Sequence, residues 1–138
     1  MSNQWQCEIA ITPQAKQSVR FIKNGRAYPD RGKAQYVNAL RLYIMAHPPT
    51  AILQGPLSLS ADFIWPYPKS WGKKKRMGIH AKATRPDIDN LVKPLKDAMT
   101  GVVFQDDAQV VRYERIGKYY GPQAAIHITV WELQKGGE

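Results

Sequence analysis

Hydrophobic and polar residues alternate in three stretches of this chain. In the first stretch every second residue is apolar, at Trp5, Cys7, Ile9 and Ile11. That period of two is typical of a strand with one buried face. The same alternation predicts further strands at about residues 57–65 and 125–132, and another strand is expected at about residues 109–118.

Two other stretches have the period of an amphipathic helix. The first runs from about Lys33 to Ala46 and stops before two prolines, because proline disfavours helix in the residue before it. Its apolar face comprises Tyr36, Val37, Leu40 and Ile44. The second begins near residue 89, with an apolar face of Leu91, Leu95, Ala98, Met99 and Val102. The order β-α-β-α-β-β predicts an α+β fold, a small mixed sheet with helices packed on it, as a single domain over residues 1–138.

Acidic residues gather at the start of the second helix. We expect Asp89 or Asn90 to be the N-cap, which puts Pro94 near the first turn, where its missing N–H is tolerated. Asp87 precedes the helix in an extended segment, so its side chain and that of Asp89 can converge. Lys93 follows one turn later on the side of Asp89. Taken singly, these residues are an ordinary cap and a solvated lysine.

A second acidic pair, Asp106-Asp107, follows this helix and on its own would be an ordinary turn before a strand. The chain has 20 Lys and Arg against 11 Asp and Glu, a formal charge of +9. In so basic a chain, crowded carboxylates repel each other unless they hold a cation. Mg²⁺ suits them because it takes hard oxygen ligands. The sequence does not support a metal site with cysteine or histidine ligands. The chain has one cysteine, and its three histidines are not spaced as metal ligands usually are.

Two basic segments, at about residues 12–32 and 66–86, are expected to be mobile loops that contact DNA. Pro and Gly interrupt both, and in the second the cations alternate with aromatic residues, a pattern suited to phosphate contacts and base stacking. The alternative is a solvated, disordered loop without a partner. The candidate DNA-binding residues are Lys16, Arg20, Lys23, Arg26, Lys69, Trp71, Lys73, Lys74, Lys75, Arg76, Lys82 and Arg85.

The acidic motif resembles that of one protein family. Pro86-Asp87-x-Asp89-Asn90-Leu91-x-Lys93, followed by Asp97-Ala98-Met99 and Asp106-Asp107-Ala108-Gln109-Val110, is similar to the RusA family of Holliday-junction resolvases. More weakly, Lys16 to Arg20 and Gly25-Arg26-x-Tyr28 resemble the basic loop of that family. The resemblance implies a Mg²⁺-dependent homodimer that cuts symmetric strands of four-way DNA junctions.

The resemblance also implies a role for each acid. The catalytic, metal-binding acids of the family match Asp87, Asp89 and Asp107, and its catalytic lysine matches Lys93. From the residues alone the choice between Asp106 and Asp107 stays open, because consecutive residues entering a strand point to opposite faces. The expected chemistry is phosphodiester hydrolysis by a metal-activated water, with Lys93 stabilising the transition state or orienting that water.

Two other functions explain part of the pattern. A non-catalytic basic module that binds DNA or junctions explains the charge but not the acids. A metal-dependent nuclease acting on flaps or RNA explains the acids as well as a resolvase does. No apolar run of spanning length supports a membrane partner, and the first residues lack a signal-peptide pattern, so we expect a cytoplasmic protein.

Overall fold

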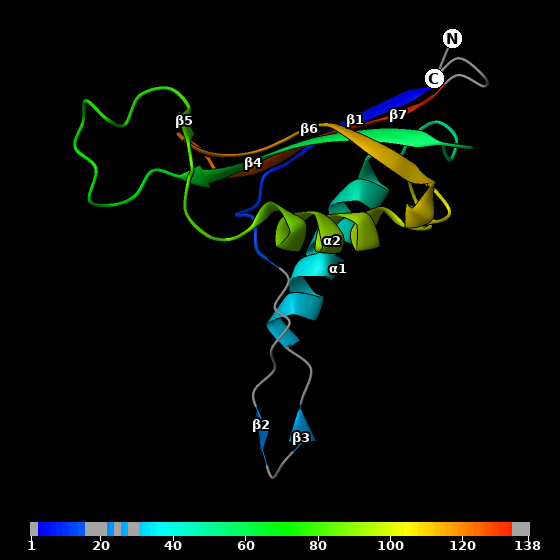
Figure 1. Cartoon of the computed structure of the whole chain (residues 1–138), viewed down its shortest axis with the longest axis horizontal. Helices are drawn as coiled ribbons and strands as arrows, with labels where there is room; N and C mark the ends of the chain where they lie inside the picture. The colour runs from blue at the N-terminus through cyan, green and yellow to red at the C-terminus, as the bar shows by residue number, and fades with distance from the viewer. Residues whose placement is uncertain (1–2, 16–21, 24–25, 28–30, 134–138) are drawn as a thin grey trace.

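The structure, a computed structural model, describes residues 3–15, 22–23, 26–27 and 31–133. Its main sheet has five strands in the spatial order β1-β7-β4-β6-β5 (Figure 1). These strands are β1 (Gln4–Ile9), β4 (Leu57–Pro66), β5 (His80–Ala81), β6 (Val110–Gly121) and β7 (Ala125–Glu132). A second, two-stranded sheet is formed by β2 (Ile22–Lys23) and β3 (Arg26–Ala27).

One parallel pair, β4 and β6, lies next to antiparallel neighbours, which makes the main sheet mixed. A parallel pair needs a long crossover connection. Here the crossover contains β5, α2 (Ile88–Met99) and the short 3-10 helix η1 (Asp107–Gln109). The acidic motif therefore lies in the connection between two neighbouring strands.

Both long helices, α1 (Arg31–Ala46) and α2, lie on the same side of the sheet (Figure 1). Alternate residues of β4 point toward them, and Leu57, Leu59, Ala61 and Phe63 are at most 1% exposed. The buried face of α2 comprises Leu91, Val92, Pro94, Leu95, Ala98 and Met99. The core therefore fills the space between the sheet and one helical layer, and the other face of the sheet carries polar side chains.

The predicted α+β class, the mixed sheet and the order of the main elements are confirmed. The element limits differ: the first helix begins at Arg31 rather than Lys33, and β6 extends to Gly121. Short strands also interrupt both segments expected to be loops, β2 and β3 in the first and β5 in the second. A two-residue strand has no periodicity to detect, because it exists only through its pairing with a neighbour. No helix of the described residues is long and apolar enough to cross a membrane.

Candidate active site

The start of α2 differs from the prediction in a way that affects the acids. The N-cap is Asp87, with an extended backbone at φ −73° and ψ 149°, rather than Asp89 or Asn90. The Asp87 carbonyl O accepts the Asn90 N–H at 3.1 Å, and the carboxylate makes no capping hydrogen bond. Helix formation thus uses the backbone of Asp87 and leaves its exposed side chain available. Because α2 begins at Ile88, Pro94 lies in its interior, two or three residues further from the N-cap than expected.

Asp89 lies in the first turn of α2 and is exposed. It lines a surface depression of about 260 Å³ together with Ile88, Val92, Lys93, Lys96 and Tyr113. Tyr113 comes from β6, and its hydroxyl O accepts a hydrogen bond from Lys96 Nζ at 2.9 Å. The depression therefore runs between the start of α2 and the neighbouring strand, with an acid and two lysines on its walls.

Lys93 connects the start of α2 to the second acidic pair. Its Nζ lies 3.1 Å from Asp97 Oδ1 and 3.3 Å from Asp107 Oδ2. The hydrogen bond with Asp97 is the main cause that raises the pKa of Lys93 above its ordinary 10.5, and Asp107 adds to it. Lys93 is therefore a cation at neutral pH, and the stabilisation from its partners is lost only as pH rises through that raised pKa. The pairs are half-exposed, so each is worth at most about 1 kcal/mol.

The two consecutive acids after α2 have different contacts. Asp106 is the N-cap of η1: its Oδ1 accepts the Ala108 N–H at 2.9 Å, and Gln109 Oε1 accepts the Asp106 N–H at 3.0 Å. Asp107 makes no such cap and instead meets Lys93. The capping hydrogen bond thus explains an acidic residue at position 106 without any metal. Asp107 has no such role and faces the lysine of α2.

The residues described by the structure contain no group of three or more His, Cys, Asp or Glu side chains placed to share a metal ion. The donor chemistry nevertheless fits Mg²⁺, since the candidate carboxylates are hard oxygen donors and Mg²⁺ is commonly held by only one or two carboxylates plus waters and phosphate oxygens. Asp87 and Asp89 are exposed, and neither carboxylate accepts a capping hydrogen bond.

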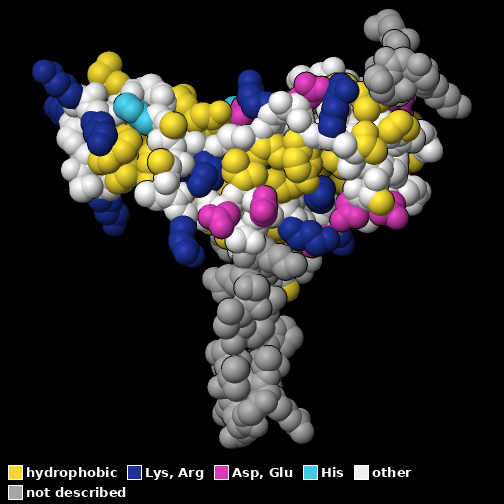
Figure 2. Space-filling view, viewed as in Figure 1, with side chains coloured by type: hydrophobic (Ala, Val, Ile, Leu, Met, Phe, Trp, Pro, Cys, Tyr) yellow, Lys and Arg dark blue, Asp and Glu magenta, His cyan; other side chains and the backbone are white. Residues whose placement is uncertain are grey.

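The basic segment between β4 and α2 projects beyond the helices at one end of the sheet (Figure 1). Figure 2 shows Lys and Arg side chains spread around this projection. Its backbone is held by Arg76, whose guanidinium donates to the carbonyl O of Trp71 at 2.8 Å and to those of Pro68 and Lys69 at 3.2 Å. Arg76 is exposed, and its guanidinium bonds carbonyl groups of its own loop, so the phosphate contact expected from the sequence stays a prediction. The mobility expected of this segment stays a prediction.

Aromatic side chains pack together at the base of this projection. The Trp71 ring stacks on Tyr67, with centroids 5.8 Å apart, and meets the edges of His80 at 5.0 Å and Tyr120 at 5.1 Å. Lys75 Nζ lies 4.3 Å from the centroid of the Trp71 ring. A base that stacks on the lysine side of this ring must therefore displace Lys75, which is itself exposed.

The remaining candidate DNA contacts occupy different surroundings. Lys69, Lys73, Lys74 and Arg85 are exposed. Lys82 is half-buried, and its Nζ donates to Thr84 Oγ1 at 2.9 Å and to the Tyr120 hydroxyl at 3.2 Å. Lys16 and Arg20 lie outside the described residues. Lys23 and Arg26 are partners in the β2-β3 pair, which lies beyond the start of α1, far from the main sheet (Figure 1).

Two basic residues near the site were missed by the sequence reasoning. Arg41 of α1 donates to the carbonyl O atoms of Asp97 and Ala98 at the end of α2. Lys118 of β6 donates to the carbonyl O of Thr84 at 2.7 Å and to that of Pro86 at 2.9 Å. Only the strand register could have indicated Lys118, since its partner Phe63 points into the core.

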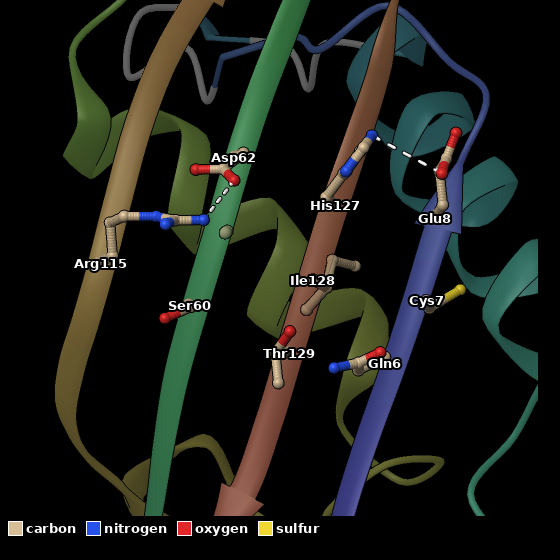
Figure 3. Close-up of a pocket in the computed structure, with 10 residues that line it drawn as sticks. Gln6, Cys7, Glu8, Ser60, Asp62, Arg115, His127, Ile128 and Thr129 are labelled. Atoms are coloured by element: carbon tan, nitrogen blue, oxygen red, sulfur yellow. Dashed lines mark hydrogen bonds and ion pairs between the residues drawn. The ribbon is translucent and has the colours of Figure 1, made fainter.

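A separate pocket of about 350 Å³ lies on the open face of the sheet. Figure 3 shows the polar side chains of this pocket, among them Asp62, Arg115 and His127, on the side of the strands away from the helices. It contains two ion pairs, Asp62 with Arg115 at 2.7 Å and Glu8 with His127 at 3.7 Å. Asp62 Oδ2 and Glu8 thus have basic partners on the same face, whereas the buried Asp62 Oδ1 has no hydrogen-bond partner among the described residues. The pocket therefore does not share the acids at the start of α2.

Comparison with known proteins gives a consistent result. The family model described as endodeoxyribonuclease RusA matches residues 8–131. The chain is 31% identical over 120 residues to the uncharacterized protein YqaN of Bacillus subtilis (strain 168), covering 81% of this chain and 84% of that protein. It is 32% identical over 107 residues to the crossover junction endodeoxyribonuclease rusA of Lactococcus phage r1t, covering 75% and 76% of the two chains.

Proposed function

Because the chain belongs to the RusA endodeoxyribonuclease family, we propose that it is a Mg²⁺-dependent endonuclease that resolves four-way DNA junctions. One structural observation carries the assignment of the site to the acids of α2 and η1: Lys93 on the exposed side of α2 contacts Asp107 from the next element. The contact puts the lysine of the motif beside the later acid, in a chain whose other charges are mainly basic.

In this proposal Asp87, Asp89 and Asp107 hold one or two Mg²⁺ ions, and waters and phosphate oxygens complete the coordination, so no single ion needs all three carboxylates. Bound Mg²⁺ would polarise the scissile phosphate and lower the pKa of a coordinated water. Asp87 and Asp89 contribute exposed carboxylates from the cap and the first turn of α2. Asp107 is favoured over Asp106 because the carboxylate of Asp106 already accepts a capping hydrogen bond.

Lys93 has a separate role in the reaction. Its two acidic partners raise the pKa of Lys93, so we expect Lys93 to supply positive charge near neutral pH. A fixed cation beside the scissile phosphate stabilises the charge that develops on the phosphate oxygens in the transition state. We expect Lys93 to contribute to the rate of cleavage more than to the affinity for DNA.

Replacing Lys93 by alanine should therefore lower the single-turnover cleavage rate by about 10²-fold or more, the usual scale for one transition-state donor. Junction affinity should change little. The measurement compares single-turnover rates at saturating protein with affinities from a binding titration. If affinity falls while the rate at saturation does not, Lys93 is only a phosphate contact.

The exposed lysines of the projecting segment, Lys73, Lys74 and Lys75, are proposed to contact phosphates. Changing all three to glutamine should weaken binding to every DNA form and reduce the slope of log K against log salt by roughly 0.9 for each lost duplex contact. Arg76 is left unchanged because it holds the loop backbone. Binding curves over a salt series test this prediction, and a triple variant with the wild-type slope would show that these lysines face solvent.

A dimer would explain paired cuts. Two protomers related by a two-fold axis present two identical sites, which matches the symmetry of a four-way junction. Sedimentation of the free protein and of its complex with a junction measures the stoichiometry directly. Two protomers per junction are expected, and one protomer per junction would contradict the symmetric mechanism.

The whole proposal is tested by incubating the protein with a mobile four-way junction, a flap, a linear duplex and an RNA hairpin, each with Mg²⁺ or with EDTA. We expect symmetric nicks in the junction only, and only with Mg²⁺. Preferential cutting of the flap or the RNA would instead identify another kind of nuclease. Junction binding without any cutting would identify a binding module.

A further inference from the structure

The segment that precedes the helix of the acids is held by a lysine of the sheet. Lys118 Nζ donates to the carbonyl O of Thr84 at 2.7 Å and to that of Pro86 at 2.9 Å. The carbonyl O of Lys118 accepts the Lys82 N–H at 3.0 Å. The segment before Asp87 is thus attached to β6 both through a backbone hydrogen bond and through the ammonium group of Lys118.

Regular secondary structure does not hold this segment. The residues between β5 and α2 form neither helix nor strand, and Pro86 has no N–H to donate. The N-cap of α2 has no side-chain hydrogen bond that would fix its entry. A charged donor makes stronger hydrogen bonds than a neutral one. Lys118 therefore adds two charged hydrogen bonds to the backbone before Asp87, beside the bond of Lys82 Nζ to Thr84 Oγ1 at 2.9 Å and that of the Asn90 N–H to the Asp87 carbonyl O at 3.1 Å.

The register of the sheet explains why Lys118 can reach these carbonyls. Lys118 is the partner of Phe63 in the parallel β4-β6 pair, so both side chains leave the sheet on the same face. Phe63 is fully buried on the helix side. Lys118 therefore extends toward the segment that enters α2, and it is half-buried there.

We propose that Lys118 is a positioning residue, which holds the Thr84 and Pro86 carbonyls so that the Asp87 carboxylate enters the metal site in a fixed place. This inference rests on the proposed function of the acidic site. Lys118 needs no contact with DNA in this role, because its bonded N–H groups point at backbone oxygens. Misplacement of a catalytic group by about 1 Å can lower a rate by about 10²-fold, so a restraint on Asp87 is sufficient to matter.

The test uses Lys118→Met and, should that variant fail to fold, Lys118→Gln, which keeps a donor group. Lys118→Arg, with several donors, is the conservative variant expected to restore function in part. The matched control is Arg112→Met, which removes the same charge from the same strand, where Arg112 pairs with Glu114 at 2.6 Å. Each protein is examined by hydrogen–deuterium exchange of the peptide covering residues 82–90, by Mg²⁺ titration of single-turnover junction cleavage and by junction binding in EDTA.

For Lys118→Met we expect about tenfold faster exchange in residues 82–90, a roughly tenfold higher Mg²⁺ midpoint and a lower rate, with unchanged junction affinity in EDTA. Arg112→Met should match the wild type in all three. Unchanged exchange in residues 82–90, or an unchanged Mg²⁺ response, would overturn the positioning role. A loss of affinity in EDTA with a flatter salt dependence would overturn it too, because Lys118 would then be a phosphate contact.

The failure of this inference can be separated from failure of the proposed function. If the wild-type protein shows no Mg²⁺-dependent cleavage, the proposed function fails and the positioning role fails with it. If the wild type cleaves with Mg²⁺ and Lys118→Met responds to the metal in the same way, only the positioning role is lost.

Discussion

Replacing Asp87 or Asp89 by asparagine should abolish cleavage of a four-way junction while leaving junction binding intact or tighter. The amide keeps the shape of the side chain but removes the negative charge that a hard cation needs. Removing a carboxylate also lowers repulsion toward phosphate, which is why binding does not fall. The measurement is a cleavage time course with Mg²⁺ beside a binding titration in EDTA.

The matched control for both variants is Asp62→Asn. Asp62 is also an aspartate in an ordered element, but it pairs with Arg115 on the open face of the sheet. It should cleave like the wild type, provided that its thermal unfolding is checked first. Substantial Mg²⁺-dependent cutting by Asp87→Asn or Asp89→Asn would show that the site lies elsewhere.

The second large effect should separate two neighbouring residues. Asp107→Asn is expected to lower the cleavage rate by about 10²-fold or more and to raise the Mg²⁺ midpoint. Asp106→Asn should be nearly silent, because asparagine caps a helix about as well as aspartate and can still accept the Ala108 N–H. Single-turnover rates over a Mg²⁺ series measure both quantities.

A control is needed because Asp107 also contacts Lys93. If Asp107 acts only by orienting that lysine, Lys93→Ala and Asp107→Asn should show the same Mg²⁺ midpoint. A midpoint raised by Asp107→Asn alone indicates that this carboxylate binds the metal. Mild and equal effects of Asp106→Asn and Asp107→Asn would mean that the third ligand is a different residue.

Periodicity predicted most of the fold because the core has one simple geometry. Every second residue of β4 and one stripe of α2 face the same space, so the burial of Leu59 and Leu95 could be predicted from spacing alone. The same spacing missed Val92, since the buried stripe of α2 is wider than the pattern used to find it. The crossover connection decides which face of the sheet both helices cover. Alternation within a single strand carries no information about that face.

The candidate site was predictable only in part. The spacing within α2 placed Asp89 and Lys93 on one side, but it put the cap at the wrong residue, because the cap is made by the backbone of Asp87. Contacts between distant segments were out of reach of local patterns. The hydrogen bonds of Lys118 to the segment before α2 depend on tertiary structure. The roles of the acids themselves stay predictions.

The central claim is that a metal held by these carboxylates contacts the scissile phosphate. A junction with sulfur in place of one non-bridging oxygen at the mapped cleavage site tests this contact, because sulfur is a poor ligand for Mg²⁺ and a good one for softer metals such as Cd²⁺. We predict that one of the two phosphorothioate isomers is cut much more slowly than the normal junction with Mg²⁺, and that adding Cd²⁺ restores its rate. Equal slowing with both metals, or no slowing with either, would contradict direct contact between the metal and the phosphate.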